Sequence, residues 1–211
     1  MELHQSWLTL VKKYRAIAVI RAPEISLGKK MALAMAAAGM DLIEITWNSD
    51  RPAELINILQ AELPDCVIGA GTLLHRQHLQ EAIATGAKFL FTPHLDVEML
   101  AIARQENIPI IPGALTPTEI VTAWQYGASC VKVFPVSSLG GISYIKSLRA
   151  PLPQIPLIPT GGVTLDNAQD FIKAGAVAVG LSGELFPQEL VASNNWQAIA
   201  ARAQKLRQTL S

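Results

Sequence analysis

The sequence predicts a (β/α)8 barrel, the TIM-barrel architecture, with a short helix at about residues 6–14 before the first strand. Strand-like and helix-like segments alternate along the chain, and eight such pairs in 211 residues fit this fold at its compact limit. The strand candidates are continuous apolar runs, as parallel strands covered by helices require. A doubly wound open sheet is the second choice. Because we find no linker, we expect one domain over residues 1–211.

The expected strands are 16–21, 42–46, 66–72, 89–93, 108–113, 131–135, 157–161 and 176–181. The helices expected after them are 27–38, 52–62, 75–85, 96–106, 117–126, 141–148, 166–173 and about 196–209. Ser26 is a suitable N-cap for the first of these helices. Every second strand is preceded by a glycine, which can end a helix in the left-handed conformation. These glycines are Gly39, Gly86, Gly127 and Gly175.

Composition and charge exclude several classes of function. Half of the residues are apolar, 16% are charged and the formal net charge is zero, so there is no basic surface for nucleic acid or an anionic membrane. No apolar run reaches the roughly 18 residues of a membrane span, and the N-terminus lacks a signal-peptide pattern. Cys66 and Cys130 are expected to be reduced, buried thiols of a cytoplasmic protein. The weak net charge favours association, so we expect a homo-oligomer.

Lys132 is the first candidate for catalysis. It lies in the apolar run Cys130-Val131-Lys132-Val133-Phe134-Pro135, which reads as a buried strand. A lysine is rarely buried unless it is paired or used. Because desolvation lowers the pKa of an amine, and a neutral amine can attack a carbonyl carbon, this position predicts a nucleophilic lysine.

Glu44 interrupts a second apolar strand, Leu42-Ile43-Glu44-Ile45-Thr46. Active sites of (β/α)8 barrels lie at the carboxyl ends of the strands, so Glu44 and Lys132 could meet in one pocket. Two interpretations stay open. The two groups could form a structural ion pair, or they could be functional groups whose pKa values are perturbed for catalysis.

Other strand ends carry groups suited to an anionic ligand. Arg21 ends the first strand, and its guanidinium suits a carboxylate, although a salt bridge at the rim of the barrel is an equal alternative. The Gly161-Gly162 turn, followed by Thr164 or Asp166 at a helix start, offers backbone N–H groups. The Ser182-Gly183 turn offers the same, and loops after strands seven and eight are the usual phosphate site of these barrels. Ordinary turn geometry is the alternative for either turn.

The sequence contains no pattern for a metal or an organic cofactor. His75 and His78 open a helix and are expected to be solvated, whereas His94 ends a strand and could line the pocket. No H-E-x-x-H motif is present, and Gly-Ala-Gly-Thr at 69–72 is not a dinucleotide fingerprint. We therefore expect no metal, no cofactor and no nucleic-acid partner.

These residues, in this order, resemble the family of 2-keto-3-deoxy-6-phosphogluconate (KDPG) and 4-hydroxy-2-oxoglutarate (KHG) aldolases, class I enzymes on a (β/α)8 barrel. The matching segments cover about residues 15–185. They are Ala18-Val19-Ile20-Arg21-Ala22, Ile43-Glu44-Ile45-Thr46, Gly69-Ala70-Gly71-Thr72, Thr92-Pro93-His94-Leu95-Asp96, Pro112-Gly113, Thr116-Pro117-Thr118-Glu119, Lys132-Val133-Phe134-Pro135 and Pro159-Thr160-Gly161-Gly162-Val163. Each motif is weak alone, but the ordered set is specific.

The resemblance implies a role for each matching residue. Lys132 would be the Schiff-base lysine and Glu44 the general acid/base, in a carbon–carbon lyase of the Entner–Doudoroff pathway. Arg21, Thr72 and Thr160 would hold the carboxylate derived from pyruvate. The pocket walls would be Pro93 and Phe134, and the phosphate would be received by Gly161, Gly162, Ser182 and Gly183. Related aldolases are often trimers, which implies a homotrimer here.

The chain departs from the family pattern at two places. Some members carry an arginine two residues after the threonine of the second strand, where this chain has Asn48. The usual order after the eighth strand is glycine then serine, whereas this chain has Ser182 then Gly183. Both departures concern how the sugar chain and its phosphate are held.

The expected partner is a small keto acid or a phosphorylated sugar acid. Cleavage would give pyruvate with glyceraldehyde 3-phosphate from KDPG, or with glyoxylate from KHG. A phosphogalactonate-derived substrate fits the same core. Two other classes are alternatives: a phosphosugar isomerase or epimerase that uses Glu44 without covalent catalysis, and a non-catalytic barrel that binds a keto acid.

Overall fold

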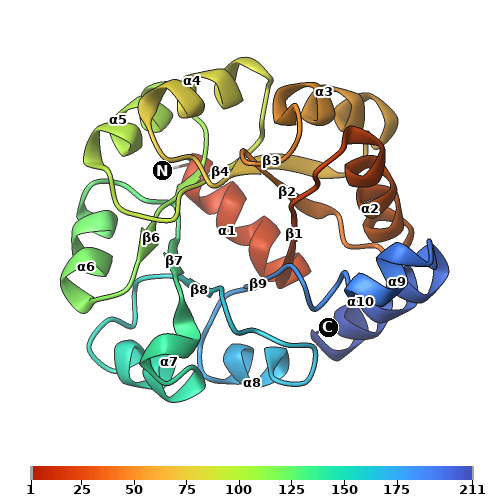
Figure 1. Ribbon diagram of the computed structural model, residues 1–211. Helices are drawn as coiled ribbons and strands as arrows, with labels where there is room; N and C mark the ends of the chain where they lie inside the picture. The colour runs from red at the N-terminus through yellow and green to blue at the C-terminus, as the bar shows by residue number, and fades with distance from the viewer. Residues whose placement is uncertain (1, 211) are drawn as a thin grey trace.

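The computed structural model describes residues 2–210, in which strands and helices alternate (Figure 1). The strands are β1 (Ala16–Ile20), β2 (Leu42–Thr46), β3 (Val67–Gly71), β4 (Leu90–Phe91), β5 (Ile110–Ile111), β6 (Gly113–Ala114), β7 (Val131–Val133), β8 (Leu157–Pro159) and β9 (Val179–Leu181). The helices are α1 (Glu2–Tyr14), α2 (Ile25–Ala37), α3 (Pro52–Glu62), α4 (Arg76–Ala84), α5 (Val97–Gln105), α6 (Pro117–Gln125), the 3-10 helix η1 (Val136–Leu139), α7 (Ile142–Arg149), α8 (Ala168–Lys173), α9 (Gln188–Ala192) and α10 (Trp196–Leu210).

The strands form two parallel sheets. One has the order β5-β4-β3-β2-β1-β9 and the other the order β6-β7-β8. An isolated parallel bridge between Thr160 and Gly180 links the end of β8 to β9, and only Pro112 separates β5 from β6. The sheets surround one centre, with helices outside (Figure 1). This confirms the α/β class, and the doubly wound alternative is wrong because the strand order lacks the reversal that such a sheet requires.

Apolar side chains fill the structure on both faces of the strands. The larger cluster packs the strands against the surrounding helices. A smaller one fills the centre, where Trp7 and Val11 of α1 meet inward-facing strand residues such as Ile17 and Leu42, and also Phe89 just before β4. The ring centroids of Trp7 and Phe89 lie 5.0 Å apart. Helix α1 thus covers the amino ends of the strands and leaves the carboxyl ends for a site.

Local sequence explains how several helices begin and end. Thr116 and Glu119 form a reciprocal capping box at the start of α6, and Asp96 accepts hydrogen bonds from two amides of α5. The four glycines expected after helices all have positive φ, from 73° to 101°, which confirms the left-handed conformation predicted for them.

Some predicted element bounds were wrong. Strand five does not run unbroken through 108–113, because Pro112 has no N–H group and divides it into β5 and β6. Ser26 is not an N-cap: α2 begins at Ile25 after Glu24, and the Ser26 hydroxyl donates to the Glu24 carboxylate at 3.3 Å. Helix α8 begins at Ala168 rather than Asp166. The elements η1 and α9 were not predicted at all.

Candidate active site

A cavity of about 460 Å³ lies at the carboxyl ends of the strands. All eleven site residues predicted from the sequence line it: Arg21, Glu44, Thr72, Pro93, Lys132, Phe134, Thr160, Gly161, Gly162, Ser182 and Gly183. They come from seven strands or from the residues directly after them. The fold therefore brings together side chains that are up to 162 positions apart, from Arg21 to Gly183, in one concave site.

Six further residues line the cavity wall; of these, sequence reasoning named only Thr164, as a possible helix start after the Gly161-Gly162 turn. They are Val19, Val163, Thr164, Gly180, Leu181 and Glu184. Strand alternation from Arg21 could have indicated Val19, since side chains two residues apart share a face. Glu184 lies in an exposed loop, where no periodicity marks its direction. Asn48, in contrast, is exposed and does not line the cavity.

Strand alternation places Lys132 and Glu44 toward the centre. Cys130 and Leu42 belong to the central cluster, so Lys132 and Glu44, two residues further along β7 and β2, face the same interior. Both are buried, with 6% of Lys132 and 2% of Glu44 exposed. The residues next to them on the same strands are apolar and buried. Their packing fixes the depth at which the two polar groups lie inside the ring of strands.

Burial moves the pKa values of these two groups toward each other. Desolvation raises the pKa of Glu44, while the positive charges of Lys132 and Arg21 partly oppose that rise. Desolvation lowers the pKa of Lys132, opposed by the carboxylate of Glu44 and assisted by the positive charge of Arg21. Both directions favour the neutral forms, an amine that can attack and a carboxylic acid that can donate a proton.

The two groups feel each other's charge without forming an ion pair. Among residues 2–210, no Lys132–Glu44 contact lies within the 4.0 Å that defines a salt bridge. The buried Oε1 atom of Glu44 has no hydrogen-bond partner in the described part of the chain. The structural ion pair considered from the sequence is therefore absent there, and Glu44 keeps one buried acceptor atom without a partner.

Aromatic rings and a close glycine define the surroundings of the two groups. The Lys132 Nζ atom lies 4.6 Å from the centroid of the Phe134 ring and 5.9 Å from that of Phe91. On the opposite wall the Glu44 carboxyl group packs on Gly71, where a Cβ atom would lie only 1.7 Å from Oε1. Gly71 thus makes room for Glu44, and the rings keep Lys132 in an apolar setting.

Two residues at the rim are held by backbone geometry. Thr72 has φ 57°, a left-handed conformation that is costly for a β-branched residue. The end of β1, beside Arg21, is fixed because the Ala22 amide donates to Ser49 Oγ at 3.1 Å. Ser49 Oγ in turn lies 3.2 Å from Thr46 Oγ1. The loop after β2 therefore determines where the β1 end, and with it Arg21, lies.

The turn after β8 is ordered by side-chain hydrogen bonds. Gly161 and Gly162 have φ 80° and 99°, and Asn167 Nδ2 donates to the Gly162 carbonyl at 3.1 Å. Thr164 and Asn167 exchange reciprocal bonds, with N–O distances of 2.8 and 3.1 Å. These contacts hold the glycine backbone against the cavity. Since α8 starts only at Ala168, the expected helix end does not directly follow the two glycines.

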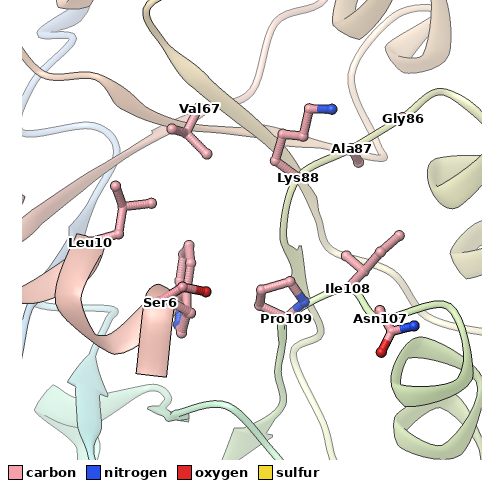
Figure 2. A pocket seen from close by; sticks show the side chains of 10 residues that line it. Ser6, Leu10, Val67, Gly86, Ala87, Lys88, Asn107, Ile108 and Pro109 are labelled. Atoms are coloured by element: carbon pink, nitrogen blue, oxygen red, sulfur yellow. The ribbon is translucent and has the colours of Figure 1, made fainter. Parts of the chain in front are cut away.

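A second cavity, of about 510 Å³, lies at the amino ends of the strands beside α1. Ser6 and Leu10 flank it on one side and Ile108 and Pro109 on the other, while the Lys88 side chain extends away from Pro109 (Figure 2). None of the predicted site residues lines it. No buried pair of ionisable groups lies on its wall, and the site residues predicted from the sequence lie at the opposite end of the strands.

Two further properties describe the residues that the structure covers. Within residues 6–210, whose side chains the structure describes, no three or more His, Cys, Asp or Glu side chains are grouped to hold a metal ion. No helix in this range combines the length and the apolarity that crossing a membrane requires.

The sequence model described as KDPG and KHG aldolase matches residues 8–202. The chain belongs to the KDPG and KHG aldolase family. Membership makes this protein an aldolase, a carbon–carbon lyase, as the resemblance of its motifs predicted.

Known relatives of this aldolase match it along almost its whole length. The 2-dehydro-3-deoxy-phosphogluconate aldolase of Haemophilus influenzae is 34% identical over 90% of this chain and 91% of its own. The KHG/KDPG aldolase of Escherichia coli K12 is 29% identical over 90% and 89%. The crystal structure of KDPG aldolase from Legionella pneumophila, with pyruvate captured at low pH as a covalent carbinolamine intermediate, superimposes with a TM-score of 0.87. It is 26% identical and covers 94% of this chain and 97% of its own.

Proposed function

We propose that this aldolase forms a Schiff base between Lys132 and its keto-acid substrate, with Glu44 as the general acid/base. The observation that carries the proposal is the burial of both groups in one cavity without an ion pair between them. At pH 7 a lysine with a pKa of about 10.4 is neutral in roughly one molecule in 2,500, and each unit of lowering raises that fraction about tenfold. The lowered pKa of Lys132 therefore supports its role as a nucleophile.

The proposed reaction is reversible aldol cleavage. The Lys132 amine adds to the C2 ketone, and the carbinolamine loses water to give a protonated Schiff base. Glu44 serves these proton transfers and then accepts the proton of the C4 hydroxyl, directly or through a water molecule. The C3–C4 bond breaks, its electron pair forms an enamine on Lys132, and the aldehyde leaves. Protonation at C3 and hydrolysis release pyruvate and regenerate the amine.

The substrate is proposed to be KDPG, cleaved to pyruvate and glyceraldehyde 3-phosphate, KHG, cleaved to pyruvate and glyoxylate, or both. The names of the Haemophilus and Escherichia relatives support this pair. The phosphogalactonate-derived analogue is the alternative, because it presents the same keto-acid end to Lys132 and Glu44.

The other residues of the cavity are proposed to bind the substrate. Arg21, Thr72 and Thr160 hold the keto-acid carboxylate, since a guanidinium and two hydroxyl groups suit such an anion. The pocket walls are Pro93 and Phe134, and the far end of the substrate meets Gly161, Gly162, Ser182 and Gly183. Support comes from their common position on the cavity wall.

We also propose that the strands close into a complete (β/α)8 barrel and that residues 1–211 form one domain. The Thr160–Gly180 bridge supports closure on one side, and on the other the Lys132 amide donates to the Pro112 carbonyl at 2.9 Å.

A cytoplasmic location fits two thiols that stay protonated at neutral pH, since burial raises the pKa of Cys66 to about 11 and of Cys130 to about 12. A homo-oligomer, as the trimer of related enzymes suggests, fits a chain without net charge that exposes Leu74, Tyr126 and Leu139.

Reduction with borohydride in the presence of pyruvate tests the mechanism. We expect a covalent adduct on Lys132, located by intact mass and peptide mapping, and no adduct in Lys132→Met. Lys88→Met is the matched control, since Lys88 is exposed at the opposite end of the strands. An adduct that survives Lys132→Met refutes the assignment. Turnover of a phosphosugar without any adduct would favour the isomerase or epimerase, and reversible pyruvate binding alone would favour the non-catalytic barrel.

A further inference from the structure

A column of aromatic rings leads from α1 to Lys132. Trp7 of α1 packs on Phe89, with ring centroids 5.0 Å apart, and Phe89 meets Phe91 of β4 at 5.8 Å in a T-shaped arrangement with an interplanar angle of 82°. The Lys132 Nζ atom lies over the Phe91 ring, 5.9 Å from its centroid. Phe91 thus connects the packed centre of the molecule to the atom proposed to attack the substrate.

Phe91 contacts the Lys132 amine from the interior of the protein. It belongs to the central apolar cluster, is only 1% exposed and does not line the active-site cavity. Phe134, whose ring centroid is 4.6 Å from Nζ, does line that cavity. The nitrogen therefore lies near one ring on the cavity wall and a second ring that is buried behind it.

The position of the Phe91 ring is fixed by its surroundings. Phe89, on which it packs, is confined by Trp7 and by Gly69, where a Cβ atom would lie only 2.4 Å from the Phe89 ring. The Leu73 amide donates to the Phe91 carbonyl at 3.3 Å, which ties β4 to the segment after β3. The ring is thus a preorganised surface for whatever charge develops at Nζ.

A buried aromatic face suits a nitrogen that alternates between neutral and cationic states. The face of a ring carries negative potential and attracts a cation within about 6 Å of its centroid, most strongly where water is excluded. Being apolar, the same ring also accepts the neutral amine. The charged groups that act on Nζ from other elements are Glu44 of β2 and Arg21 at the end of β1.

We propose that Phe91 is a further functional residue of this aldolase, whose ring face stabilises the positive charge of Lys132 Nζ in the ammonium and in the protonated Schiff base. The proposal rests on the proposed Schiff-base function and adds a residue to that site. Such a contact changes the equilibrium between cation and neutral amine by a factor of roughly 2 to 30. A ring that only fills space would have no such effect.

The test replaces Phe91 by phenylalanines that carry increasing numbers of ring fluorines, up to the pentafluoro form. Fluorine withdraws the negative charge of the face but nearly keeps the shape of the ring, so the burial of Lys132 stays constant. The 13Cε NMR signal of Lys132, identified by its loss in Lys132→Met, reports the ammonium–amine midpoint. We expect the midpoint to move stepwise to lower pH, with an ammonium dissociation constant roughly 2- to 30-fold larger in the pentafluoro form.

Trapping with pyruvate and borohydride tests the Schiff base. Above the midpoint a neutral amine must become a cationic adduct, so the pyruvate concentration for half-maximal trapping should rise by the same factor. Well below the midpoint the nitrogen is cationic before and after reaction, so this concentration should not change. The matched control places the same fluorinated residues at Phe89, which is buried in the same column but lies one ring further from Nζ.

An ammonium dissociation constant that changes by less than about 1.5-fold across the series, or that changes equally with the substitutions at Phe89, overturns the proposal. So does a pyruvate requirement that shifts by the same factor on both sides of the midpoint. If the adduct on Lys132 forms in the wild type but the fluorinated rings have no effect, only the proposal for Phe91 is wrong. If the wild type forms no adduct, the proposed function itself fails, whatever the NMR titration shows.

Discussion

Gly71→Ala should inactivate this aldolase by displacing Glu44 without changing any ionisable group. An added Cβ atom would lie 1.7 Å from Glu44 Oε1 and 2.3 Å from Cδ, where ordinary contact begins at 3.4 Å. The carboxyl group must therefore move by roughly 2 Å. Gly71 is a strand residue whose φ lies outside the left-handed region, so the backbone itself accepts alanine. The perturbation is thus a steric one, aimed at a single side chain.

The expected loss follows from the size of this movement. A displacement of about 1 Å at a reacting group can cost roughly 100-fold in rate, which corresponds to about 2.7 kcal/mol at about 1.36 kcal/mol for each factor of ten. We expect kcat for aldol cleavage to fall at least 100-fold. Overpacking in a buried site should lower the free energy of unfolding by about 1–3 kcal/mol, so the protein should still fold.

Steady-state kinetics of pyruvate release and thermal unfolding measure the two effects. Glu44→Ala supplies the control, because it removes the carboxyl group that the added methyl group would strike. In that background Gly71→Ala should change the free energy of unfolding by less than about 0.5 kcal/mol. A kcat within threefold of the wild type, or the same loss of stability in both backgrounds, would refute the reasoning.

Three further predictions concern the activity of Glu44→Gln, the pH dependence of its stability, and the packing of the strands. Glu44→Gln should keep the pyruvate adduct and slow cleavage by about 100- to 10,000-fold, as steady-state kinetics would show; unchanged turnover removes Glu44 from the mechanism. Its pH dependence has a defined sign, because burial raises the pKa of Glu44 above the ordinary 4.5. The folded wild type holds this proton longer than the unfolded chain and loses stability as pH rises from 4.5 through the raised pKa. Glutamine does not titrate, and Lys132 is common to both proteins, so the Tm of Glu44→Gln relative to the wild type should increase as the pH rises above about 4.5. A Tm difference that stays constant with pH contradicts the pKa shift. In Gly113→Ala the added Cβ atom would lie 2.3 Å from the Pro93 carbonyl carbon. Because a backbone atom cannot move aside as a side chain can, the free energy of unfolding should fall by about 3 kcal/mol. Denaturant titration against the wild type measures this loss.

Most of the elements and the two central groups were predictable from the sequence because their signals are local. An apolar run of strand length is recognisable without its neighbours, and so is a charge within it, since the cost of burying Lys132 or Glu44 depends on the residues immediately around it. The glycines after helices carry the same kind of information, because a positive φ is a property of one residue. For these features, chain order alone was sufficient.

Features that depend on tertiary distance were not available from the sequence. Whether Lys132 and Glu44 form an ion pair depends on how far β2 and β7 are shifted along their axes relative to each other. No local sequence pattern encodes that shift. The break at Pro112 was missed because a proline can end a strand or divide it, and only the pairing partner decides which. Glu184 was missed for a different reason: it lies in an exposed loop, and a loop has no periodicity that would show which residue faces a cavity.

In the proposed mechanism, the separation of Lys132 and Glu44 explains how one apolar setting can serve both the amine and the acid. Schiff-base formation needs an amine without its proton and an acid that still holds one. In water these states seldom coincide, because a carboxylic acid of ordinary pKa has lost its proton long before a lysine loses its own. Desolvation raises the first pKa and lowers the second, so the pH gap between the two neutral forms becomes narrower. A direct ion pair would reverse this by stabilising both charges, and the separation of the two groups in the cavity is therefore as important to the chemistry as their burial.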